Sequence, residues 1–330
     1  MYGVRHRRGL LGAVLAFVLA ATAVAAARHL LNDNERTYVS GVRWPQQGQA
    51  ALVLGNGRPA ASPYEQPVPI ASLAKVMSAY LILEHYPLRG AQDGFTITVT
   101  EAQAQVEAHD QSVVAVRAGE QLTERQLLEA LLIPSANNVA QILATQVAGS
   151  EARFVAEMNA DARALGMDHT IYTDPSGFDP STVSTAADQL RVFQRAMRLP
   201  VLRQIASMAS VTLPVAATLT NYNPLIAEGY AGKTGSDSAA RGCLAFFTHV
   251  TISGRRLTAI GVVMGQGQGS DTSVLLTAAG DAAQQLVDSV APTLRLGTIG
   301  ASGAARGPGA EAGRHRRSLL IAPGRVPAQP

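Results

Sequence analysis

The order of the predicted secondary-structure elements restricts the fold of this chain most. Residues 49–61 read QAALVLGNGRPAA, and an Asn-Gly pair between two apolar runs is the strongest short-range signal for a β-hairpin. Helical periodicity then dominates residues 72–196, with one short predicted strand, TITVT at 96–100, and longer apolar strands return at 231–250 and 255–265. This order predicts an α/β core sheet whose strands come from both ends of the chain, with a helical subdomain inserted between them.

The predicted helices have recognisable beginnings and ends. Thr123 and Gln126 have the spacing of a capping box, and Pro134 ends the helix that follows them. Pro87 closes the first helix, and Gly166 is the stop of a later one. Helices are predicted over 72–84, 123–133, from 135, over 151–166, from about 185 and over 274–290.

The chain is basic only at its ends. Its net charge is +3, but four of its 27 Lys and Arg residues lie in 1–30 with no acid, and six lie in 295–330 with one acid. Residues 31–294 therefore hold 17 basic and 23 acidic groups, a net charge of −6. This part of the sequence has no basic groove with interleaved aromatic residues, so we expect no nucleic-acid partner.

The sequence offers no metal or cofactor site. Cys243 is the single cysteine, which excludes an intramolecular disulfide and a cysteine metal cluster, and we expect it to be a small buried residue. The histidines at 85, 109, 169 and 249 lack metal-ligand spacing, and no glycine-rich phosphate loop follows a predicted strand. We therefore expect neither a metal nor a cofactor.

The two ends of the chain differ from its body. Residues 1–30 begin with a basic cluster and continue into an apolar run from Gly9 to Ala27. This pattern is typical of an export signal or, because the run approaches the roughly 20 residues that cross a bilayer, of an uncleaved membrane anchor. Either one predicts export of the body, residues 31–296, across the cytoplasmic membrane. Gly, Ala, Arg and Pro dominate 297–330, where we expect a disordered tail.

Lysine occurs only at positions 75 and 233, although the chain has 27 Lys and Arg residues. Ser72 and Lys75 lie three residues apart at the start of a predicted helix, so their side chains share one face. A serine hydroxyl needs a neighbouring base, and lysine serves when burial or nearby cations lower its pKa, whereas arginine stays protonated. In a simpler interpretation, Ser72 caps the helix and Lys75 is a solvated first-turn residue.

Other short motifs also have two interpretations. In Ser135-Ala136-Asn137, the serine follows Pro134 and has the position of a helix cap. Lys233-Thr234-Gly235 has the form of a strand end before a tight turn, although a glycine there also lets a ligand lie close to the strand. The stretch TDPSG at 173–177 is most simply a turn, and its alternative interpretation is a loop that contacts a substrate. The order Ser-x-x-Lys, Ser-x-Asn, Lys-Thr-Gly along one chain favours the functional interpretation.

In this order the motifs resemble the signature of the penicillin-recognising serine enzymes. The segments VPIASLAKVMSAYLILE, LLIPSANNVAQILA, LGMDHTIYTDPSGFD, STAADQL and GKTGSDSAARGCLAFF are similar to the low-molecular-weight D-alanyl-D-alanine carboxypeptidases, and the similarity covers residues 50–290. The resemblance implies a β-lactamase/transpeptidase-like fold of the α/β (α+β) class. In that fold an antiparallel sheet is flanked by helices, with an all-helical subdomain and the active site in the cleft between them.

The resemblance also implies catalytic roles. Ser72 would be the nucleophile that attacks the D-alanyl-D-alanine carbonyl, and Lys75 the base that takes its proton. Ser135 would relay a proton towards the leaving amine in a network with Lys233. The backbone N–H groups of Ser72 and Ser236 would form the oxyanion hole.

Substrate binding would use the remaining motif residues. Asn137 would hydrogen-bond the substrate amide, and Lys233 and Thr234 would hold the terminal carboxylate beside Gly235 and Ser236. The implied partners are a peptidoglycan peptide as substrate and β-lactam antibiotics as acylating inhibitors, with membrane contact through residues 1–30 if they are not cleaved.

The sequence departs from the family after VVMG at 262–265. In relatives a basic residue that helps to hold the substrate carboxylate commonly follows such a strand, but no Lys or Arg occurs here from Leu257 to Leu294. Carboxylate binding would then depend on Lys233, Thr234 and, in one of two interpretations, Arg241. In the other interpretation, Arg241 is a solvated or structural residue.

The leading functional prediction is a serine DD-carboxypeptidase that trims peptidoglycan stem pentapeptides. A DD-endopeptidase that cuts cross-links would use the same residues, so it stays an alternative. A non-catalytic sensor that binds β-lactam or peptidoglycan is a second alternative. A class A β-lactamase needs a carboxylate for its deacylating water, and the corresponding stretch contains no Glu-x-x-Leu-Asn.

Overall fold

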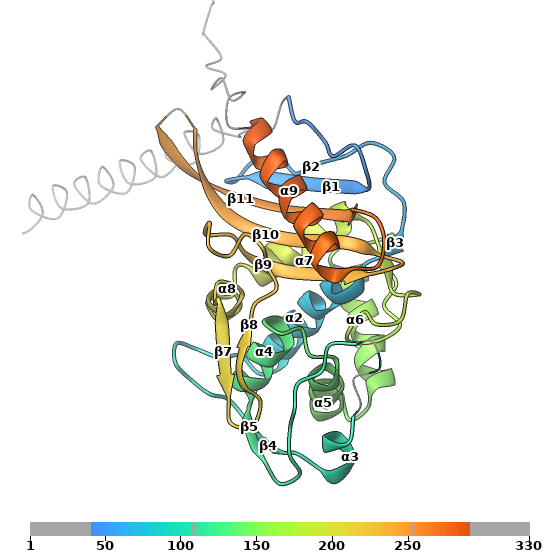
Figure 1. The fold of residues 1–330 in the computed structure, drawn as a ribbon, viewed down its shortest axis with the longest axis vertical. Helices are drawn as coiled ribbons and strands as arrows, with labels where there is room; N and C mark the ends of the chain where they lie inside the picture. The colour runs from blue at the N-terminus through green and yellow to red at the C-terminus, as the bar shows by residue number, and fades with distance from the viewer. Residues whose placement is uncertain (1–40, 107–108, 110, 253, 291–330) are drawn as a thin grey trace, which may run out of the picture. The chain divides into compact units, whose positions relative to one another are not determined.

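The computed structural model describes residues 41–106, 109, 111–252 and 254–290. They form a five-stranded antiparallel sheet and a mainly helical subdomain beside it (Figure 1). The predicted signal or anchor over 1–30 and the predicted tail over 297–330 lie outside the described residues. Among the described residues, no helix has the length and apolarity needed to cross a membrane.

Strands from both ends of the chain meet in the main sheet, as the element order predicts. Its strand order is β2-β1-β11-β10-β9, so β1 from the N-terminal hairpin pairs with β11 from the last third of the chain. Leu52 lies opposite Gly261 in this pairing, and Ala245 lies opposite Lys233 between β10 and β9. The strands are β1 (Gln49–Leu54), β2 (Ala60–Ala61), β9 (Ala231–Asp237), β10 (Arg241–Ile252) and β11 (Arg255–Gln266).

Helices cover both faces of this sheet. Helix α9 (Thr272–Val290) packs on one face against β10 and β11, and α7 (Ala186–Ala196) packs on the other face against β1 and β11 (Figure 1). Successive residues of a strand point to opposite faces, and β1 is buried on both. Its Ala50, Leu52 and Leu54 join the core beneath α9, while Ala51 and Val53 join the core of the helical side.

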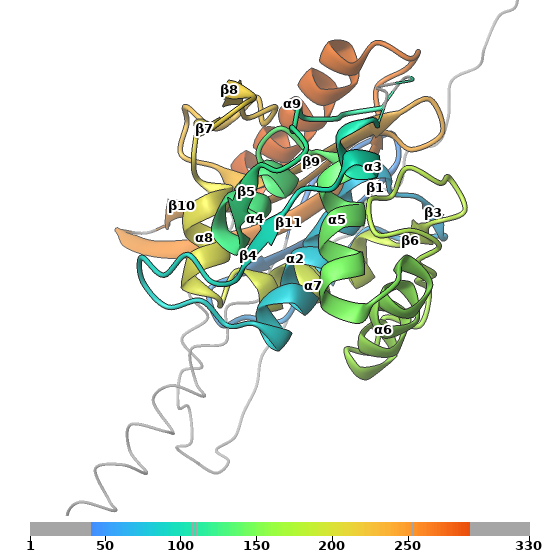
Figure 2. The same ribbon diagram turned by 90° about the horizontal axis from the view of Figure 1, so that it is seen from below.

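Helix α2 (Ala74–His85) is the central element of the subdomain. It contacts α4 (Glu124–Leu132), α5 (Asn137–Ala148), α6 (Glu151–Ala164) and α7 (Figures 1 and 2). Because other helices surround α2, nine of its twelve residues are buried, including polar ones. The capping box that the sequence predicts at the start of α4 is present, with reciprocal hydrogen bonds between Thr123 and Gln126.

The subdomain also contains short strands and helices, so it is mainly and not entirely helical. The short strand predicted at 96–100 is present as β4, whereas helical periodicity does not predict the others. Strand β4 pairs with β5, β7 pairs with β8, and β3 pairs with β6, and two short helices accompany them. These elements are β3 (Val68–Pro69), β4 (Thr96–Thr98), β5 (Gln121–Thr123), β6 (Val183–Ser184), β7 (Ser210–Leu213), β8 (Ala217–Thr220), α3 (Glu101–Ala104) and α8 (Pro200–Ala206).

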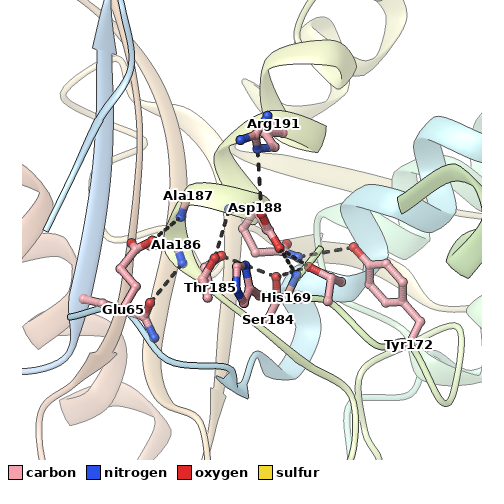
Figure 3. A network of polar contacts seen from close by, with 12 residues as sticks. Glu65, His169, Tyr172, Ser184, Thr185, Ala186, Ala187, Asp188 and Arg191 are labelled. Carbon is pink, nitrogen blue, oxygen red and sulfur yellow. Dashed lines mark hydrogen bonds and ion pairs between the residues drawn. The ribbon is translucent and has the colours of Figure 1, made fainter. Parts of the chain in front are cut away.

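A polar network connects the segment around Glu65 to the beginning of α7 (Figure 3). The Glu65 carboxylate accepts a hydrogen bond from the Ala187 N–H at 3.3 Å, and burial raises the pKa of Glu65 to about 7. Asp188 accepts from the His169 N–H at 2.9 Å and from the Thr170 hydroxyl at 3.0 Å. The segment from His169 to α7, which includes the TDPSG loop, is therefore held at both of its ends.

Cys243 is fully buried in β10, as the sequence predicts for a small core residue. Burial raises the pKa of its thiol to about 12, so the thiolate form is disfavoured at neutral pH.

Candidate active site

The three predicted motifs meet in one cleft, which has a volume of about 930 Å³. One wall comes from the sheet, through β9 and the segment before α9, and the other comes from the subdomain. The motif residues that line the cleft are Ser72, Ser135, Asn137, Thr234, Gly235 and Ser236. Lys75 and Lys233 lie beneath them, fully or almost fully buried.

Ser72 lies in a short 3₁₀ helix, η1 (Ala71–Leu73), directly before α2. Ala71 has a left-handed backbone with φ of +45°, an unusual conformation for a residue with a side chain. Within the described residues, neither η1 nor α2 begins with a side-chain cap. The Ser72 hydroxyl instead lies 2.7 Å from the Lys75 Nζ, so the simpler interpretation of Ser72 as a helix cap is wrong.

Lys75 is buried and has three hydrogen-bond partners in the site, so it is not a solvated residue. Its side chain is 0 % exposed, and Nζ lies 2.7 Å from Ser72 Oγ, 2.6 Å from Asn137 Oδ1 and 2.9 Å from the Ser176 carbonyl oxygen. Burial holds the pKa of Lys75 well below its ordinary range, the positive charge of Lys233 lowers it further, and Asp174 opposes the shift. A neutral amine is therefore accessible next to a serine hydroxyl.

Ser135 does not cap α5, and its side chain instead contacts Lys233 across the cleft. Its φ is +63°, and Ala136 stands at the N-cap position of α5. The Ser135 hydroxyl accepts a hydrogen bond from Lys233 Nζ at 2.9 Å. Burial lowers the pKa of Lys233 to about 7, and its Nζ also donates to the Thr234 carbonyl oxygen at 2.7 Å.

Gly235 lets β9 approach η1 closely. A Cβ atom at this position would lie 2.9 Å from the Ile70 carbonyl oxygen and 3.1 Å from the Ser72 amide nitrogen. These distances leave no room for a side chain without a shift of the backbone. In the main sheet β9 is an edge strand, so one side of its backbone is open towards the cleft beside Ser72.

Asn137 is oriented by two partners, one of which the sequence analysis missed. Its Nδ2 donates to Gln111 Oε1 at 3.1 Å, which fixes Oδ1 as the atom that faces Lys75. Gln111 stands 26 residues before Asn137, and nothing in the local sequence marks it. The Ser176 carbonyl was missed too, although the Asp-Pro-Ser-Gly turn in which it lies is visible in the sequence.

Arg241 is not brought into the site. It is exposed at the first position of β10, with φ of +57°, and is not among the described residues that line the cleft. Two half-exposed aromatic residues that the sequence analysis did not single out, Phe178 and Tyr222, do line the cleft.

Residues 60–268 match the family model described as D-alanyl-D-alanine carboxypeptidase. Among curated relatives, the D-alanyl-D-alanine carboxypeptidase DacB2 of Mycobacterium tuberculosis is 35% identical over 57% of this chain and 64% of its own length. A D-alanyl-D-alanine endopeptidase of Pseudomonas aeruginosa is 34% identical over 44% of this chain and 45% of its own length. The chain thus spans less than two thirds of the length of either relative.

The fold matches that of a solved structure as well. The crystal structure of the Streptomyces K15 DD-transpeptidase superimposes with a TM-score of 0.63, covering 75% of this chain and 98% of that chain at 23% identity. The predicted β-lactamase/transpeptidase-like fold, with an antiparallel sheet flanked by helices, is therefore confirmed.

Proposed function

This chain belongs to the D-alanyl-D-alanine carboxypeptidase family, and on that premise we propose that it removes the terminal D-alanine from peptidoglycan stem pentapeptides through an acyl-enzyme on Ser72. One observation carries the proposal. The hydroxyl of Ser72 lies 2.7 Å from a fully buried lysine nitrogen, inside a cleft that also holds the Ser135 hydroxyl and the open edge of β9. A nucleophile, a base and a peptide-binding edge are the parts that acyl transfer requires.

In the first step, neutral Lys75 takes the proton of the Ser72 hydroxyl while Oγ attacks the carbonyl carbon of the penultimate D-alanine. The backbone N–H groups of Ser72 and Ser236 stabilise the resulting oxyanion, and such donors are each worth about 3 kcal/mol in serine hydrolases. The carbon–nitrogen bond then breaks, and the proton passes from Lys75 through Ser135 to the leaving amine of D-alanine. Water hydrolyses the ester, which releases the shortened peptide and restores the Ser72 hydroxyl.

The substrate peptide lies along β9 in this proposal. An extended peptide gains main-chain hydrogen bonds when it adds to an exposed sheet edge, and Gly235 allows this edge to lie close to Ser72. Asn137 holds the peptide amide, and protonated Lys233 with Thr234 attracts the terminal carboxylate. Because Arg241 is exposed and is not among the described residues that line the cleft, we assign it no part in carboxylate binding.

The site of action is outside the cytoplasmic membrane in this proposal, because the substrate is in the cell wall. The basic start and apolar run of residues 1–30 support export. Cleavage of that segment would release the protein, and retention would anchor it.

The experiment is intact-mass analysis of the full-length protein after incubation with benzylpenicillin, followed by peptide mapping. We expect one added penicilloyl group on Ser72 in the wild type and none in Ser72→Ala. An unmodified wild type at saturating antibiotic overturns the proposal. Release of D-alanine from a pentapeptide at equal rates by the wild type and Ser72→Ala overturns catalysis and leaves the sensor interpretation.

A DD-endopeptidase is the second candidate, favoured by the similarity to the Pseudomonas aeruginosa enzyme of that name. Purified cross-linked and uncross-linked muropeptides, offered side by side, separate the two activities. Release of free D-alanine from the uncross-linked substrate supports the carboxypeptidase, and cleavage of the cross-linked substrate alone supports the endopeptidase.

A further inference from the structure

The loop over 174–182 delivers a backbone carbonyl to Lys75, and a single carboxylate organises this loop. Asp174 Oδ1 lies 2.7 Å from the Ser176 N–H, 2.6 Å from the Ser176 hydroxyl and 2.8 Å from the Gly177 N–H. It lies 3.3 Å from the Phe178 N–H. Asp174 Oδ2 accepts from the Asp179 N–H at 3.0 Å and from the Thr182 hydroxyl at 3.2 Å. Six donors around one carboxylate fix the direction of every peptide unit from 175 to 178.

The organised loop is fastened to α2 on the face that carries Lys75. Ser78 lies three residues after Lys75, so the two side chains are neighbours on this face. The Ser78 hydroxyl donates to the Pro175 carbonyl at 2.6 Å, and Lys75 Nζ donates to the next carbonyl, that of Ser176, at 2.9 Å. Gly177 then passes so close to η1 that a Cβ atom would lie 1.9 Å from the Ala71 carbonyl oxygen.

The Ser176 carbonyl decides how the protons of Lys75 are arranged. A neutral amine has two N–H groups and one lone pair. Asn137 Oδ1 and the Ser176 carbonyl oxygen can only accept, so they take both N–H groups. The lone pair is then left for the third neighbour, the Ser72 hydroxyl at 2.7 Å. Without the carbonyl of Ser176, the amine is free to rotate and to turn an N–H group towards Ser72.

We propose that Asp174 is a positioning residue for acylation, which aims the Ser176 carbonyl at Lys75 and thereby directs the lone pair of the base at Ser72. The inference rests on the proposed function, since it concerns the proton transfer from Ser72 to Lys75. Asp174 also acts on this transfer through its charge. Lys233 and Asp174 are the charged groups that act on Lys75, and Asp174 raises the pKa that burial and Lys233 lower.

The test is the rate constant of acylation by a fluorescent penicillin, measured on full-length variants between about pH 5 and pH 9. Asp174→Asn keeps Oδ1 as an acceptor but loses the acceptor at Oδ2 and the negative charge. We expect the plateau rate to fall about tenfold, because small misplacements of a catalytic group cost up to about 100-fold. We also expect the acidic limb to move to lower pH, because Lys75 without the nearby carboxylate stays neutral in more acidic solution.

Asp179→Asn is the matched control. It makes the same charge change in the same loop, but the Asp179 side chain is exposed and accepts from the Ser181 N–H instead of from the groups around Lys75. We expect its profile to superimpose on that of the wild type. A purely structural role of Asp174 would lower the melting temperature and the fraction of active protein without moving the acidic limb.

The Ser78→Ala variant tests the position of the loop separately from the charge of Asp174. It removes the hydroxyl that fastens the Pro175 carbonyl but leaves Asp174 in place. We expect a lower plateau rate with an unmoved acidic limb, and this measurement decides the question if Asp174→Asn does not fold.

Two outcomes overturn the inference. The first is a folded Asp174→Asn protein whose acylation profile equals that of the wild type, and the second is a Ser78→Ala protein with an unchanged plateau. Failure of the wild type itself to be acylated is a different result, because it overturns the proposed function and not the role of Asp174 alone.

Discussion

Lys233 Nζ lies 2.9 Å from the hydroxyl of Ser135, although 98 residues separate the two in the chain. The contact joins β9 of the sheet to the segment between α4 and α5 of the subdomain, directly across the cleft. It also places a second buried cation near Lys75, whose pKa it lowers. One side chain thus joins the two walls of the cleft and lowers the pKa of the proposed base.

Lys75→Arg should abolish most acylation while preserving a positive charge. Arginine stays protonated in proteins, so it cannot take the proton of Ser72. We expect the acylation rate constant to fall by about 10³-fold, within the range of general-base contributions. The measurement is penicillin acylation, with circular dichroism as the check on folding. A variant that acylates within a factor of about three of the wild type would show that Lys75 is not the base.

The affinity for anionic substrates should weaken above neutral pH. Burial lowers the pKa of Lys233 to about 7, so this group loses its positive charge as the pH rises through that value. We therefore expect KM for a peptide that ends in D-alanyl-D-alanine to rise between pH 7 and pH 9, at least tenfold if the charge is the main attraction. The same peptide with a C-terminal amide is the control, and its KM should change little. Parallel rises for both peptides would contradict the assignment of Lys233 to the carboxylate.

Gly177→Ala should be far more harmful than Gly229→Ala. Both glycines have left-handed backbones, with φ of +75° and +81°, so both variants carry a conformational cost of about 1 kcal/mol. Only at Gly177 would the new Cβ atom meet a backbone atom, the Ala71 carbonyl oxygen at 1.9 Å, whereas no described atom lies within 4 Å of the position at Gly229. Urea unfolding and penicillin acylation check this expectation. Similar losses of stability and activity in the two variants would refute it.

The wild type should lose stability as the pH rises through about 7, and the Glu124→Gln variant should not show this loss. Glu124 is 1 % exposed, its Oε1 has no hydrogen-bond partner among the described residues, and burial raises its pKa to about 7 from an ordinary 4.5. The folded protein then binds this proton more tightly than the unfolded chain does. The stabilisation is complete below pH 4.5 and is lost as the pH rises through 7.

For this glutamate we expect the free energy of unfolding of the wild type to fall relative to Glu124→Gln by on the order of 2 kcal/mol between pH 5 and pH 8.5. Urea titrations of both proteins at the two pH values measure the difference. A constant difference across this range would mean that Glu124 is ionised throughout.

Much of the framework was predictable from local patterns. The hairpin at β1 and β2 and the capping box of α4 are properties of short stretches, and the structure contains both. The composition singled out Lys75 and Lys233, which the structure places in the buried floor of the cleft. The short pairing of β7 with β8 was not predictable in this way. Three of the four residues of β8 are exposed, so hydrophobic periodicity is nearly absent there.

The contacts among the proposed catalytic residues were not predictable from the sequence alone. By itself, the sequence determined the order of the elements, the residue types available for acyl transfer and their membership of three motifs. Only the tertiary structure decided that Ser72 and Ser135 contact buried lysines instead of capping helices. It also decided that Gln111 orients Asn137 and that the Ser176 carbonyl contacts Lys75. The physical reason is that a pKa depends on burial and on nearby charges, and the direction of a backbone carbonyl depends on the loop that holds it. Both are set by atoms that are distant along the chain.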